Sequence, residues 1–251
     1  MGLYATDPDC IRQREYCNID AWTKAGYTGK GLSIMHDDVN ETHSECCIDM
    51  MQTILPDAKF YQVAINYLIQ GNAVLSCDVN CWTTQESMPF DNFIRKYRIN
   101  MINNSTSVKA SGTIRPTARH MQAKIKEYNL FCTGAAGNDD GKENKFKGAF
   151  VLVTGVYLNA DGAIRKGTAL KEEADFTNFM GFQSETSFSA PIICAMGGLV
   201  RSKFGLRLTQ ERVYQYLKDH TKSLGKAGRN AQYGWGIPVM GALDEEYSFG
   251  D

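Results

Sequence analysis

The chain has 251 residues, a length that fits one large domain or two small ones, and its composition is ordinary for a globular protein. Its 27 lysines and arginines nearly balance 28 aspartates and glutamates, so the net charge is −1 and no broad basic field exists to recruit nucleic acid or anionic lipid. The longest apolar stretches, such as AFVLVTGVYL, are too short to span a bilayer as helices, so we expect no membrane partner.

The ends and the cysteines constrain the setting of the protein. Eight cysteines in a chain of this length are too sparse for a disulfide scaffold, and no basic region followed by an apolar core stands at the N-terminus. We therefore expect reduced thiols and a cytoplasmic protein, the alternative being the mature part of a longer chain. No internal repeat, low-complexity tract or linker is present, which favours a single domain over residues 1–251 with residues 1–21 as an N-terminal extension.

Apolar runs alternate with amphipathic stretches for most of the length, which predicts an α/β fold: a mostly parallel sheet with helices on both faces. In chain order, strands are expected at GLSIM, KFYQVAI, NMINNSTS, LFCTGAA and FVLVTGVYL. Helices are expected at about 43–55, within DNFIRKYRI, from Pro116 through PTARHMQAKIKEYN, over 187–204, and from about 210 to 220. Thr42 and Glu45 match a capping box at the start of the first helix, and Thr209 is a cap for the last.

The stretch SETSFSAPIICAMGGLV places small hydroxyl residues and a proline ahead of an apolar helix. A serine there can be a simple cap. A nucleophilic serine also suits this position, because first-turn N–H groups and the helix dipole stabilise an oxyanion beside it. Proline is tolerated within the first turn, and the glycines that follow allow the helix to approach the sheet closely.

The segment ETSFSAP resembles the serine motif of the subtilases, the subtilisin-like serine peptidases, with Ser187 at the nucleophile. Their other motifs follow in the family's order. THSECCIDMMQTILPDAKFYQVAI resembles the histidine helix and the strand after it, which puts His43 at the catalytic histidine. LFCTGAAGNDDG resembles the segment that carries the oxyanion-hole asparagine, here Asn138.

The resemblance extends from about residue 22 to residue 243 and implies the three-layer subtilisin-like fold. MINNSTS resembles the strand that pairs with the substrate backbone, so that Ser105, Thr106 and Ser107 would line the cleft and bind an extended peptide by strand addition. YGWGIPVMGAL resembles the family's closing segment.

The acid of the implied triad has two candidates, because this chain has HDDVN where the family has Asp-Ser/Thr-Gly. An ungapped count favours Asp38 and puts Asn40 at the glycine position, where its tolerance of left-handed backbone fits. Asp37 is the alternative, since some members carry Asp-Asp-Gly and use the first acid. Strand alternation is expected to point His36 away from the site.

The resemblance implies peptide-bond hydrolysis through an acyl-enzyme on a peptide or protein substrate, a reaction that needs no metal or organic cofactor. Two departures leave a catalytically silent, peptide- or partner-binding relative as the alternative. Glu185 replaces the glycine two residues before the nucleophile, at the rim of the family's specificity pocket, where it could select a basic side chain or damp activity. Ser44 replaces the glycine after the histidine. A phosphate loop at GAAGNDDG is a third hypothesis, but its glycine spacing does not match a known fingerprint.

Overall fold

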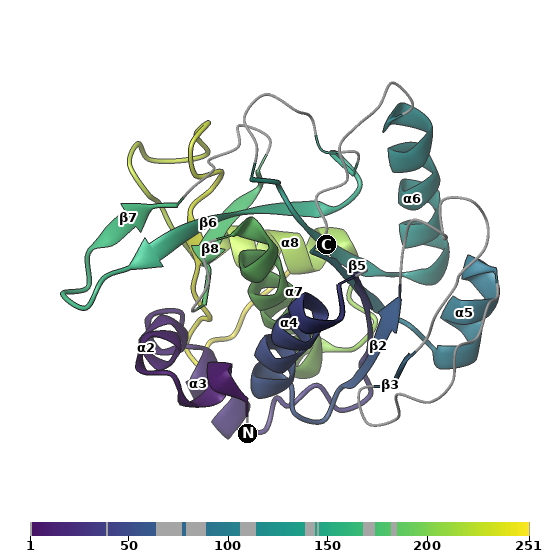
Figure 1. The fold of residues 1–251 in the computed structure, drawn as a ribbon, viewed down its shortest axis with the longest axis horizontal. Helices are drawn as coiled ribbons and strands as arrows, with labels where there is room; N and C mark the ends of the chain where they lie inside the picture. The colour runs from purple at the N-terminus through teal and green to yellow at the C-terminus, as the bar shows by residue number, and fades with distance from the viewer. Residues whose placement is uncertain are drawn as a thin grey trace.

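The computed structural model describes residues 2–38, 40–63, 77–78, 89–105, 114–138, 144, 146–167, 174–181 and 185–250. In this part of the chain, eight strands form one sheet in the order β3-β2-β1-β4-β5-β6-β7, and β8 pairs with β6 (Figure 1). The strands are β1 (Ser33–Asp37), β2 (Lys59–Val63), β3 (Cys77–Asp78), β4 (Met101–Asn104), β5 (Phe131–Ala135), β6 (Val151–Leu158), β7 (Ile164–Lys166) and β8 (Phe176–Phe179). A second, two-stranded sheet joins β9 (Thr221–Lys222) to β10 (Ile237–Pro238).

The large sheet is mostly parallel, as the alternation of apolar and amphipathic segments predicts. Strands β2, β1, β4, β5, β6 and β8 are parallel neighbours, and only β3 and β7 pair antiparallel within the described residues. Every residue of β1, β4 and β5 is buried, because helices cover both faces of these strands. The register aligns His36 with Asn103 and Asn103 with Thr133, so three polar residues form a row across adjacent strands.

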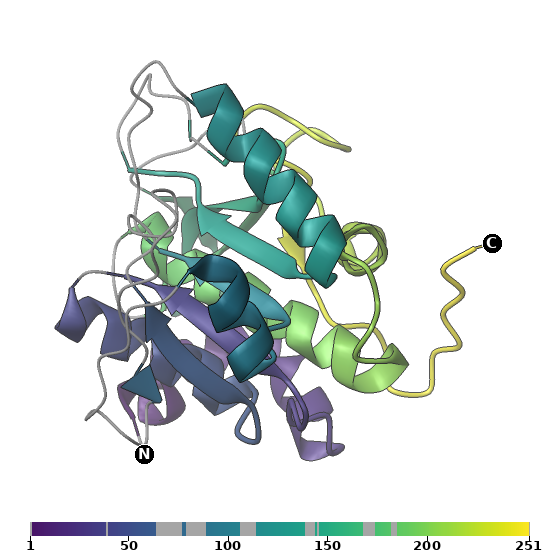
Figure 2. The same cartoon turned by 90° about the vertical axis from the view of Figure 1, so that its right-hand side faces the viewer.

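Two layers of helices enclose the sheet. On one face lie α4 (Glu41–Ile54), α7 (Thr186–Phe204) and α8 (Gln210–Asp219), whose buried side chains join one apolar cluster. On the other face, α5 (Phe90–Tyr97) and α6 (Ile114–Tyr128) cover a second cluster (Figure 2). The three-layer α/β architecture is therefore confirmed. No helix among the described residues is long and apolar enough to cross a membrane.

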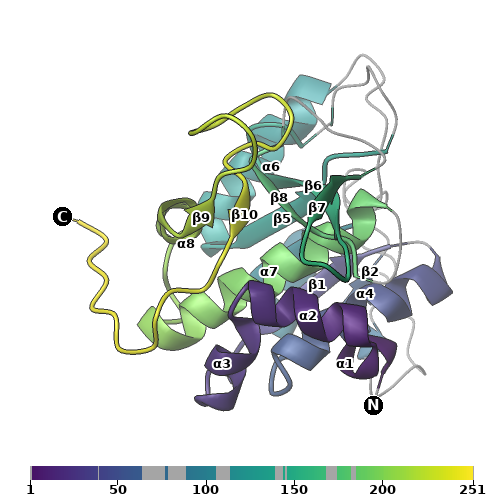
Figure 3. The same cartoon turned by 90° about the vertical axis from the view of Figure 1, so that its left-hand side faces the viewer.

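Residues 3–24, which include most of the expected N-terminal extension, fold into helices that pack on the rest of the domain. They form α1 (Leu3–Thr6), α2 (Pro8–Tyr16) and α3 (Ile19–Lys24), which lie beside α4 (Figure 3). Tyr4 and Trp22 are fully buried, and Trp22 Nε1 donates to the backbone oxygen of Gly241 at 2.8 Å. The buried Arg14 donates to the Tyr4 backbone oxygen, so this segment belongs to the core of the domain.

The helix starts differ from the expected ones in three places. Helix α4 begins at Glu41, and its cap is Asn40, whose side chain accepts from His43 N at 3.1 Å; the capping box of Thr42 and Glu45 is wrong. Helix α6 begins two residues before Pro116. Helix α7 begins at Thr186, which places Pro191 in the second turn instead of the first. The cap expected at Thr209 is present, and Gly205 is the C-cap of α7.

Helix α7 approaches β5 closely at Gly197, which has no side chain. A Cβ on Gly197 would lie 2.1 Å from Cε1 of Phe131 in β5, far inside van der Waals contact. The glycine therefore permits the close approach that the sequence predicts.

Candidate active site

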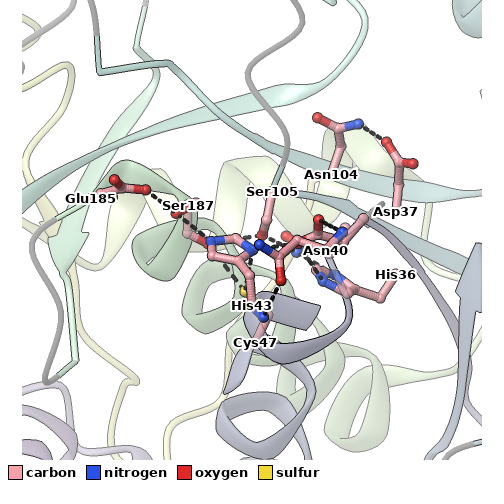
Figure 4. A network of polar contacts seen from close by, with 11 residues as sticks. His36, Asp37, Asn40, His43, Cys47, Asn104, Ser105, Glu185 and Ser187 are labelled. Carbon is pink, nitrogen blue, oxygen red and sulfur yellow. Dashed lines mark hydrogen bonds and ion pairs between the residues drawn. The ribbon is translucent and has the colours of Figure 1, made fainter. Parts of the chain in front are cut away.

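Side chains from two distant parts of the chain meet where β1, α4 and α7 converge (Figure 4). Ser187, in the first turn of α7, donates its hydroxyl to His43 Nε2 at 2.8 Å. His43 Nδ1 donates to Oδ2 of Asp38, the residue that follows β1. Asp38 is buried, whereas the His43 side chain keeps 20% of its surface exposed. A buried carboxylate thus orients an accessible imidazole whose other nitrogen faces a hydroxyl, an arrangement suited to general-base activation of that hydroxyl.

The two adjacent aspartates have different partners. Asp38 Oδ1 accepts from the backbone N–H of Asn40 at 2.9 Å, while Oδ2 faces His43. Asp37 is the last residue of β1 and accepts a hydrogen bond from Asn104 on the neighbouring strand. Figure 4 shows Asp37 directed away from the histidine. Of the two candidate acids, the structure brings Asp38 and not Asp37 to the imidazole.

Burial by itself would raise the pKa of Asp38, but the donors around it outweigh burial. The nearby His36 ring and the hydrogen bonds from His43 and from the N–H of Asn40 hold the pKa of this carboxyl well below its ordinary value. Asp38 is consequently ionised across the neutral range, which is the state that fixes the imidazole tautomer.

His36 does not point away from the site, contrary to the expectation from strand alternation. It is fully buried, and its Nε2 lies 3.8 Å from Asp38 Oδ2. Its Nδ1 accepts from Asn103 Nδ2 at 3.0 Å, and Asn103 Oδ1 in turn accepts from the Thr133 hydroxyl at 2.9 Å. Burial lowers the pKa of His36, so the ring is neutral and its remaining proton is on Nε2, facing the carboxylate. In the sequence, the signal for this contact with Asp38 is a polar residue within each of three otherwise apolar strands, which the register aligns in one row.

The carbonyl of Ser187 is held from outside its helix. In a regular helix the carbonyl of Ser187 would accept a hydrogen bond from the backbone N–H of residue 191. Pro191 has no N–H, so the Ser187 carbonyl has no such partner within its own helix. That oxygen instead accepts from the Ser105 hydroxyl at 2.8 Å and from the Cys47 thiol at 3.6 Å. Burial raises the pKa of Cys47, so the thiol stays protonated and can donate. The proline therefore frees a carbonyl that fixes the nucleophile's backbone to β4 and α4.

Asn138 lies beside the start of α7 with its amide orientation determined by two donors. Its Oδ1 accepts from Thr186 N at 2.9 Å and from the Thr186 hydroxyl at 2.8 Å. Since the amide oxygen is used in this way, the amide nitrogen is the group left to donate. An oxyanion donor at this position would use that nitrogen.

The remaining predicted residues are placed as follows. Ser105 is buried, and its hydroxyl donates to the backbone carbonyl of Ser187, so it helps to fix the backbone of the nucleophile. Thr106 and Ser107 lie outside the described residues. Glu185 is exposed, and its Oε2 lies 3.4 Å from Ser187 Oγ. Ser44 is fully buried with no recorded partner for its hydroxyl.

One set of potential metal-ligating atoms coincides with this site. One ligand atom from each of His36, Asp38 and Cys47 lies within 4.8 Å of the other two. Two of these residues already have partners in the site: Asp38 accepts from His43, and the Cys47 thiol donates to the Ser187 carbonyl. We therefore assign this set to the support of His43 and Ser187.

Comparison with known proteins agrees with this architecture. The family model described as the subtilase family matches residues 151–236. A lanthipeptide protease structure superposes with a TM-score of 0.64 at 14% identity, covering 94% of this chain and 92% of that one. Fervidolysin from Fervidobacterium pennivorans, a keratinolytic enzyme related to subtilisin, gives 0.63 at 12% identity, covering 94% of this chain and 46% of that one.

The serine protease MycP1, a component of the type VII (ESX-1) secretion system, gives a TM-score of 0.61 at 13% identity, covering 95% of this chain and 88% of that one. No curated protein sequence matches significantly. At these identities the structural likeness concerns the fold, which is subtilisin-like. Together with the family match over residues 151–236, it agrees with the resemblance of this chain to the subtilases.

Proposed function

We propose that the protein is a serine endopeptidase that cleaves peptide bonds through Asp38, His43 and Ser187. The observation that carries the proposal is the position of His43, which donates to a buried, ionised carboxylate and accepts from a serine hydroxyl at 2.8 Å. A buried serine in a helix start needs no histidine to cap it. An imidazole held in this tautomer between these two groups is what a nucleophilic serine requires.

The proposed reaction is acyl transfer to water. Ser187 Oγ attacks the scissile carbonyl carbon while His43 Nε2 takes the hydroxyl proton, and the resulting imidazolium is stabilised by Asp38. The oxyanion is held by the Ser187 backbone N–H and the amide of Asn138. His43 then protonates the leaving amine, and water, deprotonated by the same imidazole, hydrolyses the ester and regenerates Ser187.

An extended substrate would reach Ser187 along the chain that continues from β4. Ser105 is the last described residue there, and it connects the proposed substrate-binding segment to the nucleophile through the Ser187 carbonyl. Substrate backbone bound beside Ser105, Thr106 and Ser107 would add a strand and present its carbonyl to the hydroxyl.

The test is intact-mass spectrometry after reaction with a fluorophosphonate, which forms a stable adduct with activated serines. Wild-type protein should gain one adduct, and Ser187→Ala should gain none. Ser189→Ala is the matched control, because this buried serine lies two residues further along α7 and its hydroxyl donates to the Asn178 carbonyl at 3.3 Å, away from the histidine. No adduct on folded wild-type protein, or an adduct that persists in Ser187→Ala, would reject the proposal.

The alternative, a silent relative that binds peptides or partners, is favoured by one observation. The Glu185 carboxylate beside Ser187 Oγ places negative charge close to where an oxyanion would form. Peptide binding without fluorophosphonate labelling would support this second function.

A further inference from the structure

Glu185 is the residue whose position the triad does not explain. It immediately precedes α7, but its side chain makes no cap hydrogen bond to the helix. Instead, the exposed carboxylate turns toward the nucleophile and accepts from Ser187 Oγ at 3.4 Å, as Figure 4 shows. No lysine or arginine in the described part of the chain is recorded as its ion-pair partner.

Two acceptors thus share one donor. The Ser187 hydroxyl has a single proton, which is directed either to His43 Nε2 at 2.8 Å or to Glu185 Oε2 at 3.4 Å. Only the first arrangement leads to nucleophilic attack with the imidazole as base. While the hydroxyl proton faces Glu185, His43 cannot remove it, and the nucleophile is therefore not activated.

The Glu185 carboxylate also destabilises the oxyanion that forms when Ser187 attacks the scissile carbonyl. Any carbonyl that reaches Ser187 Oγ must develop its negative oxygen within a few ångströms of Glu185, and like charges at such distances repel strongly in a partly desolvated site. A cation placed against Glu185 would remove both effects, because it neutralises the charge and gives the carboxylate a stronger partner than the serine hydroxyl.

We propose that the substrate supplies this cation. Resting on the function proposed above, Glu185 is a specificity-determining residue that selects peptides with lysine or arginine at one of the two residues flanking the scissile bond. Binding of the cationic side chain draws the carboxylate away from Ser187 and returns the hydroxyl proton to His43. Uncharged substrates leave Glu185 in place and react slowly.

The experiment compares peptides that differ in charge alone. Arginine and its neutral isostere citrulline are placed in turn on each side of the scissile bond, and kcat/KM is measured for wild type and Glu185→Gln. At one of the two positions, wild type should prefer arginine by about tenfold or more. Glu185→Gln should bring that ratio to within about twofold, mainly by cleaving the citrulline peptide faster.

Glu211→Gln is the matched control, since Glu211 is an exposed glutamate in the first turn of α8 and has no nucleophile beside it. It should leave the arginine preference unchanged. Equal arginine-to-citrulline ratios in wild type and Glu185→Gln would overturn the inference, as would a wild-type preference for citrulline. Fluorophosphonate labelling of the same samples separates this outcome from failure of the proposed function: a labelled enzyme without arginine preference refutes only the role of Glu185, whereas an unlabelled wild type refutes both.

Discussion

Replacing Asp38 by asparagine should reverse the tautomer of His43. The backbone N–H of Asn40 donates to one oxygen of Asp38, and His43 Nδ1 faces the other. In Asp38→Asn the amide oxygen remains with the Asn40 N–H, so the amide NH₂ faces Nδ1 and can only donate to it. Nδ1 must then be unprotonated and Nε2 protonated, and Nε2 can no longer accept the proton of Ser187.

A tautomer reversal of this kind is worth about 10⁴-fold in kcat, equivalent to about 5.4 kcal/mol of transition-state stabilisation. The assay is the second-order rate of fluorophosphonate labelling, with peptide hydrolysis measured in parallel. The substitution changes a single oxygen to NH₂, so we expect the variant to fold. Circular dichroism and chemical denaturation test this.

Asp37→Asn is the matched comparison, since it makes the same change one residue earlier, on a side chain that accepts from Asn104. It should cost stability of about 1 kcal/mol through the altered hydrogen bond and reduce labelling by no more than about threefold. Equal losses in the two variants would refute the tautomer argument. A larger loss in Asp37→Asn would assign the acid to Asp37.

Three further outcomes are expected. Asn40→Ala should cost about 1 kcal/mol of stability through loss of the α4 cap and slow labelling as well, whereas Thr209→Ala, which removes the equivalent cap of α8, should lower stability alone; equal labelling rates in the two would contradict this. Burial lowers the pKa of His36 in the folded protein below its value in the unfolded chain. As the pH falls from 7 to 5, the His36 ring is therefore protonated in the unfolded chain but not in the folded one, and the protein loses stability. His36→Leu should remove that part of the slope, at most about 1.36 kcal/mol per pH unit, in denaturation at several pH values; an unchanged slope would show that the ring is not held neutral. Gly197→Ala should destabilise by about 1–3 kcal/mol, more than Gly134→Ala, whose added Cβ would meet its nearest neighbour at 3.4 Å, and the reverse order in urea denaturation would count against the packing argument.

Strands β1, β2, β4, β5 and β6 and most helices follow from the sequence because their apolar patterns are long and regular. Strands β3, β7, β8, β9 and β10 were not expected, because each is too short to show a pattern. The N-terminal helices do not, since α2 buries the polar side chains of Gln13 and Arg14, which satisfy backbone carbonyls instead of presenting an apolar stripe. The α4 cap was assigned incorrectly because Thr42-x-x-Glu45 fits the capping-box pattern, while Asn40 begins the helix two residues earlier.

For the site, the positions of Ser187, His43 and Asn138 could be predicted from motif order, and both aspartates were candidates for the acid. The orientation of the aspartates could not be decided from sequence, because it depends on where β1 ends and on the Asn104 side chain of the next strand. The role of His36 was missed for a related reason. Alternation describes directions along one strand, whereas the contact of His36 with Asp38 arises after the strand has ended and the chain has turned.

The separation of 144 positions between His43 and Ser187 has a consequence for the timing of synthesis. A ribosome adds about 5–20 residues per second, so roughly 7–30 s pass between the appearance of the base and that of its serine. During this interval the nascent chain contains β1 and α4 but no hydroxyl for the imidazole to activate. The histidine–serine pair assembles only after α7 has been made and has packed on the sheet.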